Sequence, residues 1–342
     1  MSSKFESHYE RVVGGSSEDQ SEARKELQAW LEEHDYEDTK PYERSASETD
    51  ANIIALAESW VDHYVTSYGG NPKPFPPESI LILEEGSVPL VTEGKLRGGF
   101  HSLLSQRIAV ERSQSDVSFA ACVAHELLHA KSYKAVQVFK DGDIGPYRSG
   151  LRVFDRTDEG HYFTDLEEAI VVESTDRFFK TELIQNPLFI SEINALTVVK
   201  RWVKKSMEIR NFSEDRQRDI LDQLYSLPHL ETIAQALEGE VDSDDPEMYK
   251  IGYIDSILIK AIQEENIGSP GRERERKAFK DTLEEILEKS GRKFTSTDEV
   301  FEEFARANFS GNLLPLARTI ENILGKGAFR KIANKFRQEF SD

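Results

Sequence analysis

The segment from His125 to His129 reads His-Glu-Leu-Leu-His and contains three side chains that could do chemistry. Residues four apart on an α-helix lie one above the other, so the two imidazoles would project from one face and could bind one metal ion. A catalytic zinc ion takes three protein ligands and leaves a fourth position for water. Because a bound metal ion lowers the pKa of water from about 15.7 to about 7, Glu126 could accept a proton from that water. The motif therefore predicts hydrolysis of a peptide bond.

The residues around the motif predict a buried helix. Residues 113–116 offer N-cap candidates, and residues 117–130 are apolar at nearly every position except His125, Glu126 and His129. Burying these three side chains costs free energy unless they are paired or bound to a metal. The context therefore favours metal ligands over histidines that merely pack in a core.

A third ligand must come from another segment, and its position separates the families of zinc peptidases. The metzincin pattern requires a histidine six residues after His129, where this chain has Ala135. Residues 162–176 form the next helix-like segment with acidic side chains. One of three glutamates in it is the expected ligand: Glu167, Glu168 or Glu173.

Helical spacing orders these three glutamates without deciding between them. Thr164 and Glu167 stand at the spacing of a capping box, which would give Glu167 a structural role at the start of the helix. Asp165 and Glu168 have the same spacing and could form the box instead. Glu173 would lie about 140° around the helix from Glu168, so both could not face one ion. Glu168 is ranked first, Glu173 second and Glu167 third.

At these two motifs the chain resembles the thermolysin-like gluzincins, and especially their uncharacterised bacterial relatives. Residues 166–170 read Leu-Glu-Glu-Ala-Ile, which is similar to the Leu-Asn-Glu-Ala stretch of that family with Glu167 in place of Asn. Residues 147–151 and 309–316 are also similar. The resemblance covers about residues 75–335 in outline. It implies a zinc metallopeptidase in which Glu168 is the third ligand.

One position departs from the pattern of this family. The family usually has an acidic residue four positions after the ligand glutamate, where it braces a zinc-binding histidine, and this chain has Val172 there. Glu173 or Asp176 could substitute for it. If neither does, we expect weaker zinc binding and reduced activity.

Peptidases of this kind also need donors for the oxyanion that forms when water attacks the carbonyl. The side chains available between the two metal motifs are Tyr147, Arg148, His161 and Tyr162. His161 is the strongest candidate and Tyr147 is taken with it, while the alternative for each is an ordinary loop or strand residue. Residues 107–112 predict a strand just before the metal-binding helix. As an edge strand it could hold an extended peptide, and its alternative is sheet core.

Composition and charge restrict the partners. The chain has 342 residues, of which 38% are hydrophobic and 31% charged, and its net charge is −20 at pH 7. This charge disfavours nucleic acid and anionic membranes, and it would attract a basic peptide or protein substrate, although solubility alone would also explain it. One cysteine, no signal-peptide core and no run of 18 apolar residues predict a cytoplasmic protein.

The order of elements predicts an α+β protein: a zincin-like lobe with a small sheet and an active-site helix, followed by a mostly helical lobe. The expected divisions are an acidic N-terminal arm with one helix (1–45), the zincin-like lobe (46–165) and the helical lobe carrying the third ligand (166–342). Strands are expected at residues 79–83, 98–103, 107–112, 151–154 and 161–163. Helices are expected at residues 18–33, 49–68, 117–130, 189–210, 213–226, 246–265, 271–289, 297–307, 312–324 and 327–339.

Three functions follow from these patterns. The first is a zinc metallopeptidase with Zn2+ as cofactor, in which His125, His129 and Glu168 bind the ion and Glu126 is the general base. The second is a catalytically inactive zinc-binding module of zincin fold that recognises a partner or ligand; Val172 and Glu167 motivate it. The third is a helical scaffold in which the histidines are merely buried.

Overall fold

The computed structural model describes residues 9–33, 38–75, 79–94, 96, 98–103, 106–154, 160–213, 216–217, 220–221, 224, 230–240, 245–263 and 270–339. Two β-sheets and a larger number of helices make it an α+β protein, as the sequence predicts. Within the described part of the chain, no helix has the length and apolar character that a membrane span requires.

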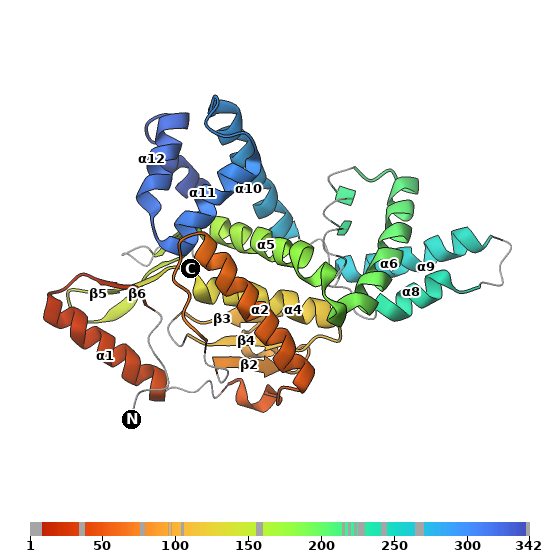
Figure 1. Ribbon diagram of the computed structural model, residues 1–342, viewed down its shortest axis with the longest axis horizontal. Coiled ribbons are helices and arrows are strands. Elements are labelled where there is room, and N and C mark those ends of the chain that lie inside the picture. Colours follow the sequence, from red (N-terminus) through yellow and green to blue (C-terminus); the bar gives the residue numbers. More distant parts are fainter. Residues whose placement is uncertain are drawn as a thin grey trace.

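A three-stranded sheet supports the helix that carries the His-Glu-Leu-Leu-His motif. Its order is β2-β4-β3, in which β2 (Ile80–Leu83) is parallel and β3 (Gly99–His101) antiparallel to the central β4 (Ile108–Glu111). Helix α4 (Asp116–Lys131) packs on this sheet, and helix α2 (Glu48–Ser67) packs on α4 (Figure 1). The predicted strand at residues 107–112 is confirmed, but its expected place at an edge is wrong, since β4 is flanked on both sides. The edge strand next to α4 is β3.

A second sheet follows α4 and includes both ends of the described chain. Its strands, in spatial order, are β1 (Arg11–Val13), β5 (Lys134–Val138), β6 (Ile144–Ser149), β7 (Arg152–Phe154), β8 (Gly160–Tyr162) and β9 (Gln338–Glu339). Strand β1 is parallel to β5, and every other pair of neighbours is antiparallel. The sequence predicted the β7–β8 pair and missed the other four strands.

The segment expected as an N-terminal arm packs on this second sheet. Helix α1 (Ser17–Glu33) and β1 share a small hydrophobic cluster with β5, formed by Tyr9, Val12, Ala23, Leu27 and Val136. Leu27 belongs to the expected apolar stripe of this helix, and the side chains of the other two stripe residues, Trp30 and Leu31, lie outside those described. The cluster is separate from the main core.

Helices make up the rest of the chain. They are α5 (Thr164–Thr181), α6 (Ile190–Ile209), α8 (Leu230–Glu238), α9 (Pro246–Gln263), α10 (Pro270–Lys289), α11 (Thr297–Ser310), α12 (Leu313–Leu324) and α13 (Ala328–Lys335). Short elements are η1 (Lys40–Tyr42), α3 (Val88–Val91), η3 (Leu183–Gln185) and η4 (Pro187–Phe189). In Figure 1, α5 crosses the middle of the molecule, with α6, α8 and α9 at one end and α10 to α12 at the other.

Most of the predicted helices are confirmed within one to three residues at each end. The helix expected at residues 213–226 falls largely outside the described residues, and α8 was not predicted. The helix expected at residues 327–339 ends at Lys335, because the chain then turns to form β9.

Helix α4 is fixed at its N-terminus by two acceptors. The Ser115 hydroxyl accepts the amide N–H of Ser118 at 3.0 Å, as an N-cap residue does. Glu192 of α6 accepts hydrogen bonds from the Ser115 hydroxyl at 2.6 Å and from the Asp116 amide at 2.8 Å. The rest of the helix is held by burial of its apolar face, including Phe119 and Leu127. This anchoring fixes where the motif side chains project.

Candidate metal centre

The side chains of the two motif histidines and of one glutamate of α5 lie close together. One turn of α4 places His125 Nε2 3.1 Å from His129 Nε2. Glu168 approaches both rings, with Oε2 3.7 Å from His125 Nε2 and Oε1 3.4 Å from His129 Nε2. The ligand atoms of the three residues all lie within 4.8 Å of one another. Ligands of a tetrahedral zinc ion lie about 3.3 Å apart, so this set fits the ion.

The other two glutamates face elsewhere. Glu173 lies 3.5 Å from Arg177, on its own helix. Glu167 is almost fully buried, and its Oε1 lies 2.9 Å from His129 Nδ1, the ring nitrogen that faces away from Glu168. Of the three candidates, Glu168 is the one that the structure places beside both Nε2 atoms.

The expected capping role of Glu167 is wrong. Helix α5 begins after Phe163, which has a left-handed backbone (φ 61°) and forms no side-chain cap. Neither Thr164 nor Asp165 is therefore the N-cap residue that a capping box requires. Glu167 instead braces His129, because a carboxylate on Nδ1 fixes the tautomer and orientation of a metal-binding imidazole.

Although position 172 carries valine, an acidic side chain of α5 other than Glu168 contacts a histidine of the motif. Asp176, an expected substitute for the missing acid, is bonded to Arg276 at 2.7 Å, and Glu173 is occupied by Arg177. The brace comes from Glu167 and acts on His129. The hydroxyl of Thr175 lies 3.5 Å from His125 Nδ1.

Charge within the cluster favours ionised carboxylates. Burial by itself would lower the pKa of His129, but the carboxylates of Glu167 and Glu168 raise it well above its ordinary value. Burial would raise the pKa of Glu168, and the nearby His129, His125 and Arg152 lower it far below its ordinary value. A cluster with two carboxylates around two imidazoles is suited to hold a cation.

Glu126 lies where α4 meets the edge strand β3. It is 6% exposed. A Cβ atom at Gly99 would stand 3.1 Å from Glu126 Cγ and 3.1 Å from Cys122 Sγ, so a larger residue there would require these side chains to shift. The backbone of β3 is therefore next to the expected general base.

The four candidate oxyanion donors divide into two groups. Arg148 is buried and donates to the carbonyls of Gly150, Ala307 and Gly311, which makes it a structural residue. The ring of Tyr162 lies beneath the Arg337 guanidinium at 5.0 Å. The other two candidates are His161 of β8 and Tyr147 of β6.

Strand register places His161 on the face of the second sheet that carries Arg152. His161 is paired with Phe154, with the two rings 4.5 Å apart, and side chains two apart on a strand share a face. Tyr147 lies at a β-bulge of β6, where the pairing with β5 shifts register, so alternation does not assign its face. Arg152 lies 3.7 Å from Glu168, so this face borders the metal ligands. Sequence reasoning missed Arg152, for which spacing along the chain gives no signal.

A buried lysine lies near the same cluster and was also missed. Lys134 Nζ lies 3.0 Å from His101 Nε2 of β3, and its backbone N–H donates to Glu10 Oε2 at 2.6 Å. Burial lowers the pKa of Lys134 to about 7, against the opposing effect of Glu10 and Glu167. This residue links the N-terminal segment, the edge strand and the surroundings of Glu167.

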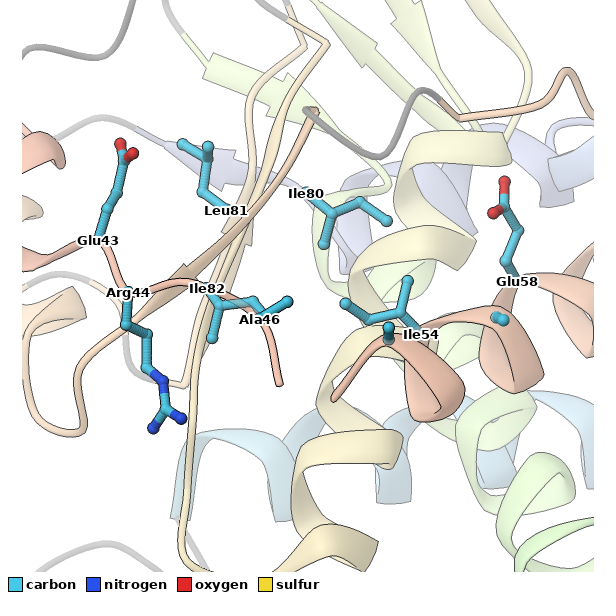
Figure 2. A pocket seen from close by; sticks show the side chains of 10 residues that line it. Glu43, Arg44, Ala46, Ile54, Glu58, Ile80, Leu81 and Ile82 are labelled. Atoms are coloured by element: carbon cyan, nitrogen blue, oxygen red, sulfur yellow. The ribbon is translucent and has the colours of Figure 1, made fainter. Parts of the chain in front are cut away.

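A separate cavity of about 530 Å³ lies between α2 and β2, and no ligand of the metal centre lines it. Figure 2 shows Ile54 of α2 near Ile80 and Ile82 of β2, with Arg44 and Glu58 at opposite ends. Its walls are mainly apolar side chains. The metal centre and this cavity are therefore distinct features.

Comparison of the chain with models of protein families, with curated proteins and with solved structures found no match.

Proposed function

We propose that this protein is a zinc-dependent metallopeptidase in which His125, His129 and Glu168 hold the ion. The observation that carries the proposal is the convergence of three ligand atoms, from two helices, within 4.8 Å of one another. Two imidazoles and one carboxylate are a ligand set of catalytic zinc sites and leave a coordination position open. The similarity of the two sequence motifs to thermolysin-like gluzincins supports the same assignment.

The surroundings of the ligands support a zincin-like lobe. The metal-binding helix α4 packs on a small sheet whose edge strand, β3, is antiparallel to its neighbour. An extended peptide could pair with an exposed strand edge through its backbone, which would bring a scissile bond next to Glu126. The proposed substrate is therefore a peptide or an extended segment of a protein.

Each residue has a defined role in this proposal. Zinc would supply a Lewis acid and a water molecule of lowered pKa. Glu126 accepts the proton of the attacking water and returns it to the leaving amine. His161 lies on the sheet face that borders Glu168, and we retain it and Tyr147 of β6 as donors to the oxyanion. The single cysteine, Cys122, suits a reducing compartment, so the proposal includes a cytoplasmic location.

Replacement of Glu126 by Gln tests the catalytic role. We expect the purified protein to contain one zinc ion per chain and to cleave members of a peptide library, and Glu126→Gln to lower kcat by about 10² to 10⁴-fold. Zinc content should stay unchanged, because Glu126 is not a ligand. Glu173→Gln is the matched control and should retain activity. Equal cleavage by wild type and Glu126→Gln would contradict the proposal.

A second candidate is a zinc-binding module without catalysis, which Val172 and Glu167 motivate. The acid that would brace a histidine from position 172 is absent, and Glu167 contacts His129 instead. A weaker brace lowers ligand basicity and metal affinity. Stoichiometric zinc with no turnover of any peptide would favour this candidate over the peptidase.

A further inference from the structure

Arg152 of β7 lies at the outer side of the metal centre and is close to two carboxylates. Its Nη2 is 3.6 Å from Glu167 Oε2 and 3.7 Å from Glu168 Oε1. Both distances exceed those of charge-assisted hydrogen bonds, which are about 2.7 to 2.9 Å. The Nε–H of Arg152 is buried, and no described residue accepts a hydrogen bond from it. The Nη2 of this guanidinium is therefore in long ion pairs with both carboxylates, and its Nε–H has no acceptor among the described residues.

Several arginines in the described chain bond at shorter distances. Arg276 donates to Asp176 at 2.7 Å, and Arg177 donates to Asp298 at 2.8 Å. Arg44 forms a pair with Asp50 that is as long as those of Arg152, at 3.7 Å. What distinguishes Arg152 is that both of its carboxylate partners also lie next to His129.

The position is accessible to a ligand. The side chain of Arg152 is 27% exposed and that of Glu168 is 32% exposed, whereas those of His125 and His129 are 13% and 12% exposed. Of these four side chains, those of Arg152 and Glu168 are therefore the more exposed.

Charge also favours an anion here. Of the two acidic neighbours, Glu167 already accepts from His129 Nδ1 at 2.9 Å, and Glu168 is the proposed metal ligand. Both carboxylates therefore have other partners when the centre holds a cation. Arginine binds a carboxylate in a bidentate manner, which its fork of N–H donors favours.

We propose that Arg152 binds the α-carboxylate of the substrate, so that the site cleaves peptides near the C-terminus. This inference rests on the proposed peptidase function and names its substrate class. The guanidinium lies 3.7 Å from Glu168 Oε1. A peptide advances about 3.3 to 3.6 Å per residue, so a carboxylate bound by Arg152 would belong to a residue close to the scissile bond.

Paired substrates test the assignment. Each N-acetylated peptide is supplied as the free acid and as the C-terminal amide, and kcat and KM are measured for wild type, Arg152→Gln and Arg152→Lys. We expect wild type to prefer the acid by at least about tenfold, and Arg152→Gln to raise KM for the acid by about 10- to 100-fold while kcat changes little. Arg152→Lys should restore part of the affinity, and values for the amide should not change. Arg306→Gln, which removes an exposed partner of Glu303, is the control.

A binding measurement separates this inference from the proposed function. Calorimetry on the zinc-loaded Glu126→Gln variant, in which Glu168 keeps its proposed partner, compares an N-acetyl dipeptide acid with its amide, and we expect the acid alone to bind and an added Arg152→Gln substitution to abolish the difference. This result holds even if no peptide is cleaved, in which case only the peptidase proposal fails. Equal handling of acid and amide by wild type would overturn the role of Arg152. Parallel loss of zinc and of activity on both substrates in Arg152→Gln would overturn it too, because the arginine would then only position Glu168.

Discussion

At the scale of single residues, Glu167 is placed to support the candidate metal centre without being one of its three converging residues. It is 1% exposed, and its carboxylate contacts His129 Nδ1 at 2.9 Å. Carboxylates in this position orient a metal-binding imidazole and raise its basicity, and their removal lowers metal affinity by about 10- to 100-fold.

We expect Glu167→Gln to lower zinc affinity by about 10- to 100-fold, since the amide keeps the size of the side chain and removes its charge. Competition with a chromophoric zinc chelator measures the change. Glu173→Gln, on the same helix but paired with Arg177, should leave the affinity unaltered. Equal affinities for wild type and Glu167→Gln would show that the contact has no part in metal binding.

Lys134 predicts a pH dependence of stability. Its pKa is lowered from 10.5 to about 7 in the folded protein, where Glu10, His101 and Glu167 are the titratable groups near it. Between these two values the unfolded chain binds a proton that the folded chain does not, so stability rises with pH by up to about 1.4 kcal/mol per unit. Below pH 7 both states are protonated and this contribution is constant.

We therefore expect the stability of wild type, relative to Lys134→Met, to increase between pH 7.5 and 9.5. Urea unfolding of both proteins at several pH values measures the difference, and a control pair with Lys293→Met, which removes an exposed lysine bonded to Thr319, should give a flat difference. A flat difference for Lys134→Met would mean that the buried lysine is charged in the folded state.

At the scale of elements, contacts from distant helices position α4. Glu192 of α6 accepts from the Ser115 hydroxyl and from the first amides of α4. Replacing a carboxylate at a helix N-terminus removes both a hydrogen-bond acceptor and a favourable interaction with the helix dipole. Helix α4 therefore receives part of its N-terminal capping from α6.

We expect Glu192→Ala to lower the free energy of unfolding by about 1 to 3 kcal/mol, because amide donors at the start of α4 lose their acceptor. Chemical denaturation followed by circular dichroism measures the loss. Glu208→Ala, on the same helix and loosely paired with Lys204 at 3.9 Å, should change stability by less than about 0.5 kcal/mol. Equal effects of the two substitutions would rule out the capping role.

Periodicity and local signals predicted the helices well because those signals are contained in the helices themselves. The apolar run before His129, bounded by Ser115, is sufficient to place α4. Strands β5 and β6 carry no such pattern: β5 begins with the buried Lys134, and β6 contains a glycine and a proline. They pair directly with each other, and β5 also pairs with β1, which is so distant along the chain that the sequence gives no signal of the contact.

The candidate site shows the same division. The pairing of His125 with His129 follows from helical spacing, and the approach of Glu168 had been ranked first among three glutamates. The role of Glu167 was misassigned because capping-box spacing fits any helix that starts at Thr164, whereas this helix starts with a left-handed Phe163. Arg152 comes from a strand, and its distance to Glu168 depends on how a hairpin folds over α5.

At the scale of the whole molecule, the candidate metal ligands bring together α4 and α5, which four strands of the second sheet separate along the chain. His129 and the α5 carboxylate that braces it are 38 positions apart, and strands β5 to β8 lie between them. An ion held by both helices would close this segment into a loop. Binding that occurs only in the folded state stabilises that state.

We expect removal of zinc by a chelator to lower the thermal unfolding midpoint and to speed hydrogen exchange in residues 134–162. Both effects should reverse when zinc is restored, and the midpoint should rise with zinc concentration. His129→Ala should respond to neither chelator nor zinc. An unchanged midpoint and unchanged exchange in the wild type after chelation would exclude a metal in this site under the conditions used.

The six-stranded sheet takes one outer strand from residues 11–13 and the other from residues 338–339. During synthesis, β1 cannot pair until β5 has been translated. The last strand, β9, begins 176 residues after the end of β8. The sheet therefore finishes assembling only when translation of this stretch is over, and contacts between such distant positions slow folding. A nascent chain halted before residue 338 would leave the β8 edge open to pairing with another polypeptide.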